Sequence, residues 1–299
     1  MLTRTVVGRA RSGRWLPRRL LLIRHGESAA NVNRTLYSHV PDWKIPLTER
    51  GRAQAFDCGK RLRNIVKDER LYVYYSPYVR ARQTLEEVRK SLLPSQVQGE
   101  REDERLREQE MGNFQPIDKM DDTWGERNKF GRAYYRFPDG ESSADVGDRL
   151  SRFFDVLVRE QLELNSLSVR TQLHDCHPDA AGDHIGGLPY DSPCIEEDNV
   201  VIVSHGLLIR LFIGRWFCAP VEVFERMRNP PNCGIVVLER SDTGRLVLTS
   251  ASKSLFGSDP LLDKMRFDGR DNIELYRQMF TEIRGEDDST GFSPEDNGP

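Results

Sequence analysis

Long hydrophobic runs, paired cysteines and a strong net charge are all missing from this sequence. No apolar stretch approaches the roughly 20 residues of a membrane-spanning helix, so no integral membrane segment is predicted. The formal net charge is only −3, so the overall surface gives no reason to expect nucleic acid or an anionic membrane as a partner. The five cysteines are scattered, which favours reduced thiols inside a cell over a secreted disulfide framework. They are Cys58, Cys176, Cys194, Cys218 and Cys233.

Acidic residues are missing from the start of the chain, ahead of Glu27. Residues 1–19 contain arginines with serine and threonine between them, a composition typical of mitochondrial or plastid presequences. A disordered basic tail has the same composition, and residues 1–14 show no clear hydrophobic face that would decide between the two. We expect residues 1–17 to be either such a targeting leader or a tail of an intracellular, cytoplasmic protein.

The rest of the chain alternates short β-rich runs with amphipathic stretches. With 37% hydrophobic residues it can bury a substantial core, so the pattern predicts an α/β fold with three α/β/α layers and a mostly parallel central sheet. A hairpin of residues 233–239 and 245–250 would close that sheet. Strands are predicted at 18–24, 71–75, 96–98 and 199–204. One helix is predicted to start at Thr48 as its N-cap, with an apolar side formed by Ala53, Ala55, Phe56, Leu62 and Ile65. Further helices are predicted at 78–93, 143–164 and 207–217.

Several segments fall outside this alternation. The catalytic domain is expected to span residues 18–255 and to carry a small helical cap insertion at about 116–136, which is rich in aromatic residues. Residues 165–199 are predicted to form an irregular surface loop. Residues 256–284 are predicted to form a helical extension, and residues 285–299 a disordered tail. The loop spacing matches no standard zinc pattern, so no metal site is predicted there. The residues that raised this question are His174, Cys176, His177, His184 and Cys194.

Candidate functional residues lie where the first predicted strand ends: Arg24, His25 and Gly26. Open α/β sheets place their ligand sites at the carboxyl ends of strands, and glycine permits a sharp turn there. Arginine offers a planar fork of donors to phosphate oxygens, and a neutral imidazole beside it can serve as base, metal ligand or nucleophile. This stretch therefore predicts a phosphate site.

The later strands carry matching features. Arg80 lies on the first turn of a predicted helix, where anions are favoured, and shares a face with Thr84, whereas Arg82 points elsewhere. His205 follows a second buried strand and precedes Gly206, so adjacent strands would bring it close to the first histidine.

Two further residues are candidates for the same site. Glu108 precedes a turn marked by Gly112, and a carboxyl held there near basic groups could donate a proton. Asn31 lies in the segment 28–43, predicted to be a loop leaving the site, close enough to help bind a ligand.

Four motifs, in order, resemble the histidine phosphatase superfamily, also called the phosphoglycerate-mutase-like fold: Arg24-His25-Gly26-Glu27, Arg80-Ala81-Arg82-Gln83-Thr84, Glu108 before Gly112, and Ser204-His205-Gly206. The resemblance covers about residues 18–255. Within the family, the segments 107–115 and 137–142 look like those of plant phosphoglycerate-mutase-like proteins and fungal broad-range acid phosphatases.

The resemblance implies a mechanism without metal or cofactor. His25 would attack phosphorus in line and form a phosphohistidine, and Glu108 would protonate the leaving oxygen and then accept a proton from water. Because Glu108 must start protonated, an acidic optimum is expected. The groups that would surround the phosphoryl oxygens are Arg24, Arg80 and His205, with Asn31 and the backbone N–H of Gly206 in support.

The same resemblance separates a phosphatase from a mutase. Cofactor-dependent mutases carry Glu-Arg-His-Tyr-Gly at the acid, whose arginine and tyrosine help hold phosphoglycerate, but this chain has Gln109, Glu110 and Met111. The substitution favours hydrolysis of a small phosphorylated metabolite. Phosphoglycerate mutase activity is the alternative. A non-catalytic phospho-ligand binding module is a further one, although binding alone would need neither His25 nor Glu108.

Overall fold

The fold centres on a six-stranded sheet in which the predicted phosphate-site strand lies between two others. The computed structural model describes residues 16–175, 199–268 and 272, and only the backbone of residues 161–175. Along the sheet the order is β3-β2-β4-β1-β5-β6, with the first four strands parallel and the last two antiparallel to their neighbours. The strands are β1 (Arg19–Arg24), β2 (Leu71–Tyr75), β3 (Val97–Glu102), β4 (Asn199–Ser204), β5 (Ile235–Arg240) and β6 (Leu246–Leu248).

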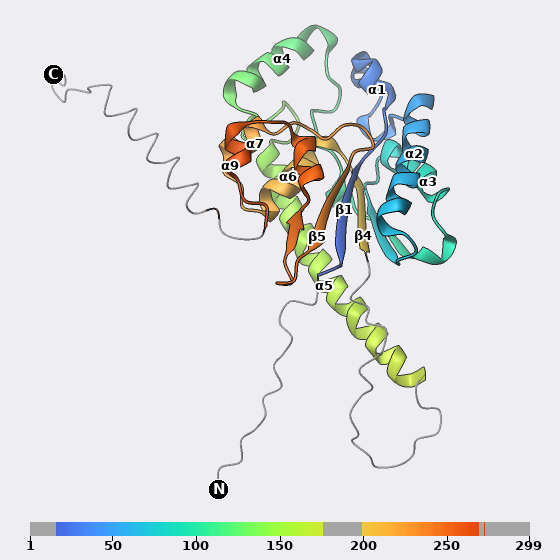
Figure 1. Ribbon diagram of the computed structural model, residues 1–299. Helices are drawn as coiled ribbons and strands as arrows, with labels where there is room; N and C mark the ends of the chain where they lie inside the picture. The colour runs from blue at the N-terminus through green and yellow to red at the C-terminus, as the bar shows by residue number, and fades with distance from the viewer. Residues whose placement is uncertain (1–15, 176–198, 269–271, 273–299) are drawn as a thin grey trace, which may run out of the picture.

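Helices cover both faces of this sheet (Figure 1), so the predicted three-layer α/β/α fold is confirmed. Two buried hydrophobic clusters, one on each face, form the core. α2 (Glu49–Val66) and α3 (Val79–Arg89) pack on one face. The other face is covered mainly by α5 (Ser143–Asp175), α6 (Gly206–Trp216) and α7 (Val221–Arg226). Shorter helices are α1 (Ala29–Val32), α8 (Ser250–Lys253) and α9 (Pro260–Lys264).

The segment predicted as a cap contains the helix α4 (Ile117–Phe130), which Figure 1 shows beyond the carboxyl ends of β1 and β4, opposite α1. The large apolar residues of α4 differ in exposure. Trp124 packs edge-on against Phe137 with ring centroids 5.6 Å apart. Ile117 and Phe130, at the two ends of the helix, are 58% and 69% exposed. The contact between Trp124 and Phe137 thus attaches α4 to the rest of the domain.

Three secondary-structure predictions were wrong. α5 continues to Asp175 instead of ending near residue 164, because no glycine or proline interrupts the sequence before Pro178. The segment 28–43 is not a plain loop: it contains α1 and the 3₁₀ turns Arg34–Ser38 and Asp42–Lys44. β3 runs four residues beyond its predicted end, and its position at the edge of the sheet explains the charged residues in it.

The buried side of α2 also differs from the prediction. Phe56 is 37% exposed and Ala53 is exposed, whereas the small residues Gly51 and Gly59 are buried. A Cβ added at Gly59 would lie 2.5 Å from the carbonyl oxygen of Val88 in α3. α2 therefore approaches α3 closely at Gly59, whereas Gly51 approaches Glu27, so both glycines lie on the buried side of α2.

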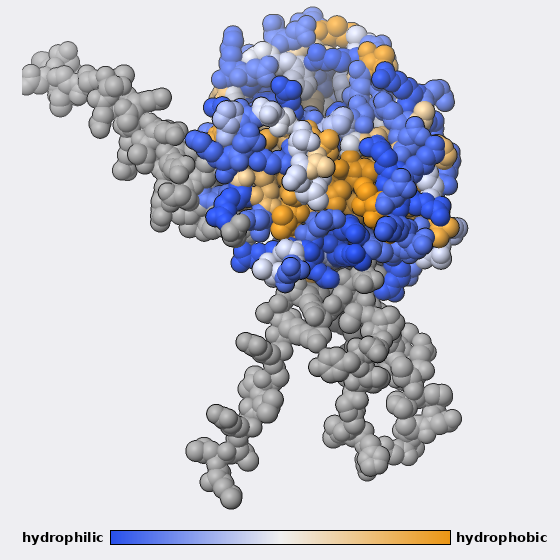
Figure 2. All heavy atoms as spheres, in the orientation of Figure 1, coloured by the Kyte–Doolittle hydropathy of each residue, from blue (hydrophilic) through white to orange (hydrophobic). Residues whose placement is uncertain are grey.

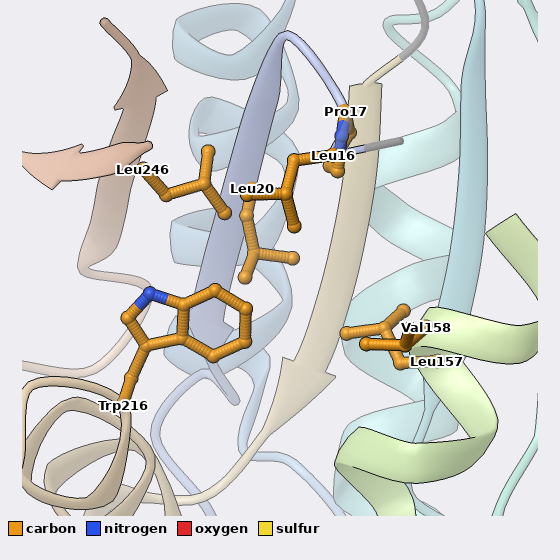
Figure 3. Close-up of a pocket in the computed structure, with 7 residues that line it drawn as sticks. All are labelled: Leu16, Pro17, Leu20, Leu157, Val158, Trp216 and Leu246. Carbon is orange, nitrogen blue, oxygen red and sulfur yellow. The ribbon is translucent and has the colours of Figure 1, made fainter. Parts of the chain in front are cut away.

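The first described residues are part of the packed body. Figure 3 shows Leu16 and Pro17 beside Leu20 of β1, facing Leu157 of α5 and Trp216 of α6 across a gap of only about 10 Å³. Arg240 donates a hydrogen bond to the carbonyl oxygen of Leu16 at 2.8 Å. Residues 1–15, 176–198 and 273–299 lie outside the described residues, so the predicted leader, most of the predicted loop and the acidic tail stay predictions.

Figure 2 shows one face of the molecule, on which hydrophilic residues predominate and hydrophobic residues gather near the middle. Within the described ranges, no helix is both long enough and apolar enough to span a bilayer. Large exposed hydrophobic side chains cluster in sequence around the cap. They include Phe114, Ile117, Phe130 and Tyr134.

Candidate active site

His25 and His205 meet at the carboxyl ends of β1 and β4. The two strands pair in parallel with Arg24 opposite Ser204, so the residue after each strand comes to the same place. Their ring centroids are 5.2 Å apart in an edge-on arrangement, and the residues are only 4% and 0% exposed. The predicted pairing of the two histidines is confirmed as a structural fact.

Hydrogen bonding assigns the tautomer of His25. Nδ1 lies 2.7 Å from the carbonyl oxygen of Gly26, which can only accept, so the proton is on Nδ1 and the lone pair on Nε2. Burial, followed by the positive charges of Arg80 and Arg24, holds the pKa of His25 well below its usual value. The ring is therefore neutral and has a free basic nitrogen even at moderately acidic pH.

The turn that carries His25 is tightly enclosed. The Gly26 N–H donates to Oγ1 of Thr84 at 3.0 Å, which ties the turn to α3. A Cβ at Gly26 would lie 2.4 Å from the carbonyl oxygen of Gly51, so only glycine fits between this turn and α2. The predicted shared face of Arg80 and Thr84 is observed, since both are buried toward the site.

The second histidine is bonded to a serine, which can donate or accept. Nε2 of His205 lies 2.7 Å from Oγ of Ser76, and that oxygen also accepts a hydrogen bond from the Tyr78 N–H at 3.3 Å. When the Ser76 hydroxyl donates its proton to Nε2, the proton of His205 lies on Nδ1. Nδ1 is buried without a partner. Burial, with the charge of Arg80 next in effect, also lowers the pKa of His205 well below its usual value.

Two arginines supply positive charge beside these rings. Arg24 donates to the carbonyl oxygen of Pro230 at 2.7 Å; among the described residues it has no carboxylate partner, and its buried Nε makes no hydrogen bond. Arg80 is 3% exposed and forms a two-pronged pair with Asp42, at 2.8 and 3.2 Å. Burial alone would lower the pKa of Arg80, but Asp42 raises it overall. Arg82 instead pairs with Glu102, away from the site.

Glu108 lies half-buried next to the start of α6. One carboxylate oxygen accepts from the N–H of Gln109 at 3.1 Å, and the other is 3.4 Å from the N–H of Leu207. The backbone around it is held by Arg149 of α5, which donates to the carbonyl oxygens of Arg105, Arg107 and Glu108 at 2.6 to 3.0 Å. Both oxygens of Glu141 pair with the same guanidinium.

Asn31 and Gly206 occupy less direct positions. The Asn31 side-chain oxygen accepts from the Ser28 N–H at 3.0 Å and completes a capping box for α1, and Asn232 also donates to it at 3.3 Å. That oxygen is engaged in holding the loop. Gly206 begins α6, where a Cβ would lie 2.9 Å from the side chain of Asn229, so its backbone is closely covered on that side.

A cavity of about 550 Å³ lies beside Asp42 and Tyr78, which both contact the Arg80 guanidinium; its lining includes neither histidine, neither arginine and not Glu108. Tyr37, Asp42 and Tyr78 line one side of it, and residues 110–115 after the acid line another. Burial, together with the negative charge of Asp42, raises the pKa of Tyr37 to about 12, so its hydroxyl stays protonated. The ring of Tyr78 lies 4.8 Å from the Arg80 guanidinium.

Sequence reasoning missed several residues of this site. Ser76 directly follows β2, and the strand-end rule that found the histidines would also have found it. No signal marked Tyr37, Asp42 or Arg149, because their distance from the motifs along the chain hides a contact that only the fold creates. Among the described residues no group of three His, Cys, Asp or Glu could hold a metal ion, and His174 is in α5. Cys176, His177, His184 and Cys194 lie outside the described residues.

The site thus combines two neutral histidines, two guanidiniums and one carboxyl at the end of a parallel sheet. Among the described residues, His205 Nδ1 and Arg24 Nε have no hydrogen-bond partner, and Nε2 of His25 keeps its lone pair. This arrangement suits a phosphate group. On an α/β fold, it indicates a protein of the phosphoryl-transfer class.

Comparison with known proteins gives the family. The sequence profile described as "Histidine phosphatase superfamily (branch 1)" matches residues 20–171 and 195–252. The chain belongs to this superfamily, and it is an enzyme of a family whose members are phosphatases and mutases. The family, fold class and enzyme class predicted from the sequence are therefore confirmed.

Relatives point in the same direction. The chain is 42% identical to phosphoglycerate mutase-like protein AT74H of Arabidopsis thaliana, with 77% of this chain and 76% of the relative covered. It is 26% identical to broad-range acid phosphatase DET1 of Saccharomyces cerevisiae, with 76% and 86% covered. Among solved structures, a mycobacterial glucosyl-3-phosphoglycerate phosphatase is 25% identical with a TM-score of 0.50, and the match covers 77% of this chain and 96% of that one.

Proposed function

We propose that the protein is a phosphomonoesterase that hydrolyses small phosphorylated metabolites through a phosphohistidine on His25. The observation that carries the proposal is the orientation of the His25 ring: Nδ1–H is held by Gly26, and Nε2 keeps its lone pair beside Arg24 and Arg80. A neutral imidazole in this state is a competent nucleophile. The similarity to a broad-range acid phosphatase supports the same activity.

In the first step, Nε2 of His25 attacks phosphorus as the bond to the ester oxygen breaks. Glu108 gives its proton to that oxygen, and an alcohol leaves. In the second step, water attacks the phosphohistidine, Glu108 takes the proton of the water, and inorganic phosphate leaves as Nε2 recovers its lone pair. The Nδ1–H of His205 and the guanidiniums of Arg24 and Arg80 neutralise the phosphoryl oxygens in both steps.

Residues around the acid support hydrolysis over phosphoglycerate mutation. Gln109 is fully buried and donates to the carbonyl oxygen of Glu141 at 2.8 Å, so it does not reach the cavity with a charge. Glu110 and Met111 line the cavity instead. A carboxylate at position 110 repels the carboxylate of a phosphoglycerate, although Arg107 at 2.9 Å screens part of its charge.

The deciding experiment compares two reactions of the purified protein. We expect release of nitrophenol from p-nitrophenyl phosphate near pH 5, loss of that activity in His25→Ala, and a 32P-labelled acid-labile intermediate in the intact protein. Flux between 3-phosphoglycerate and 2-phosphoglycerate far above phosphate release would overturn the proposal in favour of a mutase. Binding of inorganic phosphate with neither reaction would leave a non-catalytic binding module.

A further inference from the structure

The cavity of about 550 Å³ has walls of aromatic rings and carboxylates. The aromatic side chains in its lining are Tyr37, Trp43, Tyr78 and Phe114, and the carboxyl side chains are Asp42, Glu110 and Asp139. Of the residues that the structure describes, no lysine, arginine or histidine belongs to this lining. Cavities of this size hold small organic molecules, so there is room for the part of a substrate that lies beyond its phosphate.

Two wall residues connect the cavity to the candidate active site. The ring of Tyr78 packs edge-on against His205, with ring centroids 5.1 Å apart, and lies 4.8 Å from the Arg80 guanidinium. The carboxylate of Asp42 accepts hydrogen bonds from the same guanidinium at 2.8 and 3.2 Å. Because these two side chains contact the active-site groups and also line the cavity, the cavity adjoins the place where a phosphate would bind.

Backbone hydrogen bonds join the segments that form the walls. The N–H of Gln115 donates to the carbonyl oxygen of Tyr37 at 3.0 Å, which connects the segment after the acid to the 3₁₀ turn Arg34–Ser38. The N–H of Glu141 donates to the carbonyl oxygen of Glu110 at 2.8 Å, which connects the same segment to residues 137–141. The cavity is therefore built into the folded backbone, as a binding site that exists before its ligand arrives.

The carboxylates of the lining differ in their partners. Asp42 is paired with Arg80, and Glu110 is paired with Arg107 at 2.9 Å. Asp139 is exposed and forms no ion pair or hydrogen bond with any residue that the structure describes. The lining thus keeps one carboxylate without a partner, and it has no positive side chain of its own to attract an anion.

The aromatic rings of the cavity suit a positive charge. One of them already holds a cation of the protein, since Nζ of Lys44 lies 4.9 Å from the ring centroid of Trp43. Within the described ranges, no cationic side chain lies over the ring of Tyr37 or of Phe114, and Phe114 is 53% exposed. Ring faces attract ammonium groups, and carboxylates add to that attraction but repel an anion. The lining therefore complements a cation better than a neutral or a negative group.

We infer that this cavity binds the leaving group of the substrate and that this group carries a cationic nitrogen, as in the phosphate ester of an amino alcohol. The ring faces of Tyr37 and Phe114 and the carboxylate of Asp139 receive the nitrogen. The inference rests on the proposed function, in which the ester bond between phosphorus and oxygen breaks and Glu108 protonates that oxygen. The products are then inorganic phosphate and a positively charged alcohol.

The test compares two ligands of the same shape that differ in one charge. Choline phosphate carries a trimethylammonium group, and 3,3-dimethylbutyl phosphate has a neutral tert-butyl group in its place. Calorimetry on His25→Ala measures their binding without turnover. We expect choline phosphate to bind about tenfold more tightly, the size of a cation–π contact together with a nearby carboxylate. Equal affinity, or tighter binding of the neutral ester, overturns the inference.

Asp139→Asn, added to the same background, removes the unpaired carboxylate and keeps its shape. Asp139 has a φ of 54°, which asparagine also tolerates, so the turn should keep its conformation. We expect the preference for choline phosphate to fall about threefold, with binding of the neutral ester unchanged within about twofold. Asp57→Asn is the control, because that carboxylate lies on α2 and pairs with Lys60.

Phe114→Leu tests the ring, because leucine keeps an apolar side chain but has no ring face. A further threefold loss of the preference, about tenfold in all with Asp139→Asn, is expected, and a purely steric role would weaken both ligands alike. The matched control is Phe130→Leu, since that ring is 69% exposed and does not line the cavity. A preference that survives both substitutions overturns the assignment. Hydrolysis of p-nitrophenyl phosphate by the protein with His25 intact separately shows whether the proposed function holds.

Discussion

Ser76 and His205 form a buried hydrogen bond, 2.7 Å between Oγ and Nε2, which joins the ends of β2 and β4. The bond decides which face of the imidazole is available. When the serine hydroxyl donates to Nε2, the proton of His205 lies on Nδ1, which has no hydrogen-bond partner within the described part of the protein. Ser76, which belongs to none of the sequence motifs, thus orients His205, which belongs to one of them.

Replacing Ser76 tests this orientation. In Ser76→Ala the Nε2 of His205 loses its partner and the ring can take the other tautomer, so we expect kcat/KM for p-nitrophenyl phosphate to fall about tenfold, the loss of one buried hydrogen bond to a reacting group. Ser151→Ala is the control, because that hydroxyl donates to the Gly147 carbonyl within α5. Equal activity of the two variants would show that Ser76 has no such role.

The clamp formed by Arg149 predicts a loss of stability together with a loss of rate. Arg149→Met removes donors to three carbonyl oxygens of the segment before and at Glu108, and leaves Glu141 buried without this partner. We expect the free energy of unfolding to fall by about 3 kcal/mol. Urea denaturation measures it.

The same variant should lower kcat more than it weakens inhibition by inorganic phosphate, because the acid moves while the phosphate site stays in place. Arg215→Met is a matched control, since Arg215 also extends from a helix but pairs with the exposed Asp148. A parallel loss of kcat and of phosphate affinity would mean that Arg149 supports the whole site and not the acid in particular.

If Arg80 binds the substrate phosphate as proposed, Asp42 must compete with that phosphate. The carboxylate occupies both terminal nitrogens of the guanidinium, so a phosphate must share or displace it. In Asp42→Asn we expect the inhibition constant of inorganic phosphate to decrease about tenfold, because one negative charge leaves the site. Asp148→Asn serves as the surface control. Weaker phosphate binding in Asp42→Asn would instead show that the aspartate holds Arg80 in its productive position.

The buried histidines predict how stability changes with pH. Their pKa values are lowered in the native protein, whereas an unfolded chain has the ordinary value near 6.5. Below that pH the unfolded state binds protons that the native state does not, so stability is full above pH 6.5 and is lost as the pH falls. For His25 and His205 together we expect a loss of about 2 kcal/mol between pH 6.5 and 5.5.

Urea unfolding at the two pH values measures this loss. His205→Asn should reduce it by about half, to about 1 kcal/mol, because one titrating ring is gone. The exposed His39 provides the control: His39→Asn should leave the pH dependence unchanged. If His205→Asn behaves like His39→Asn, the acid sensitivity arises from other groups.

The family, the sheet and the pairing of His25 with His205 could all be predicted from the sequence. Short aliphatic strands followed by Arg-His-Gly and Ser-His-Gly put chemistry at strand ends, and parallel pairing of β1 with β4 then brings those ends together. These features are local or follow from the general geometry of α/β sheets. The secondary-structure predictions were wrong where no local sequence pattern marks the structure, such as at the end of α5 and on the glycine-containing side of α2.

Only the tertiary structure decided how the candidate site is completed. Asp42 reaches Arg80, Ser76 reaches His205, and Arg149 reaches the backbone of Glu108 from elements that are far from them in sequence or marked by no motif. Likewise, the sequence does not indicate that Arg127 of α4 and Arg210 of α6 are buried, each with an Nε that has no hydrogen-bond partner among the described residues. Sequence patterns indicate which strand, helix or turn a residue belongs to, whereas the partner of a buried charge depends on how separate elements pack.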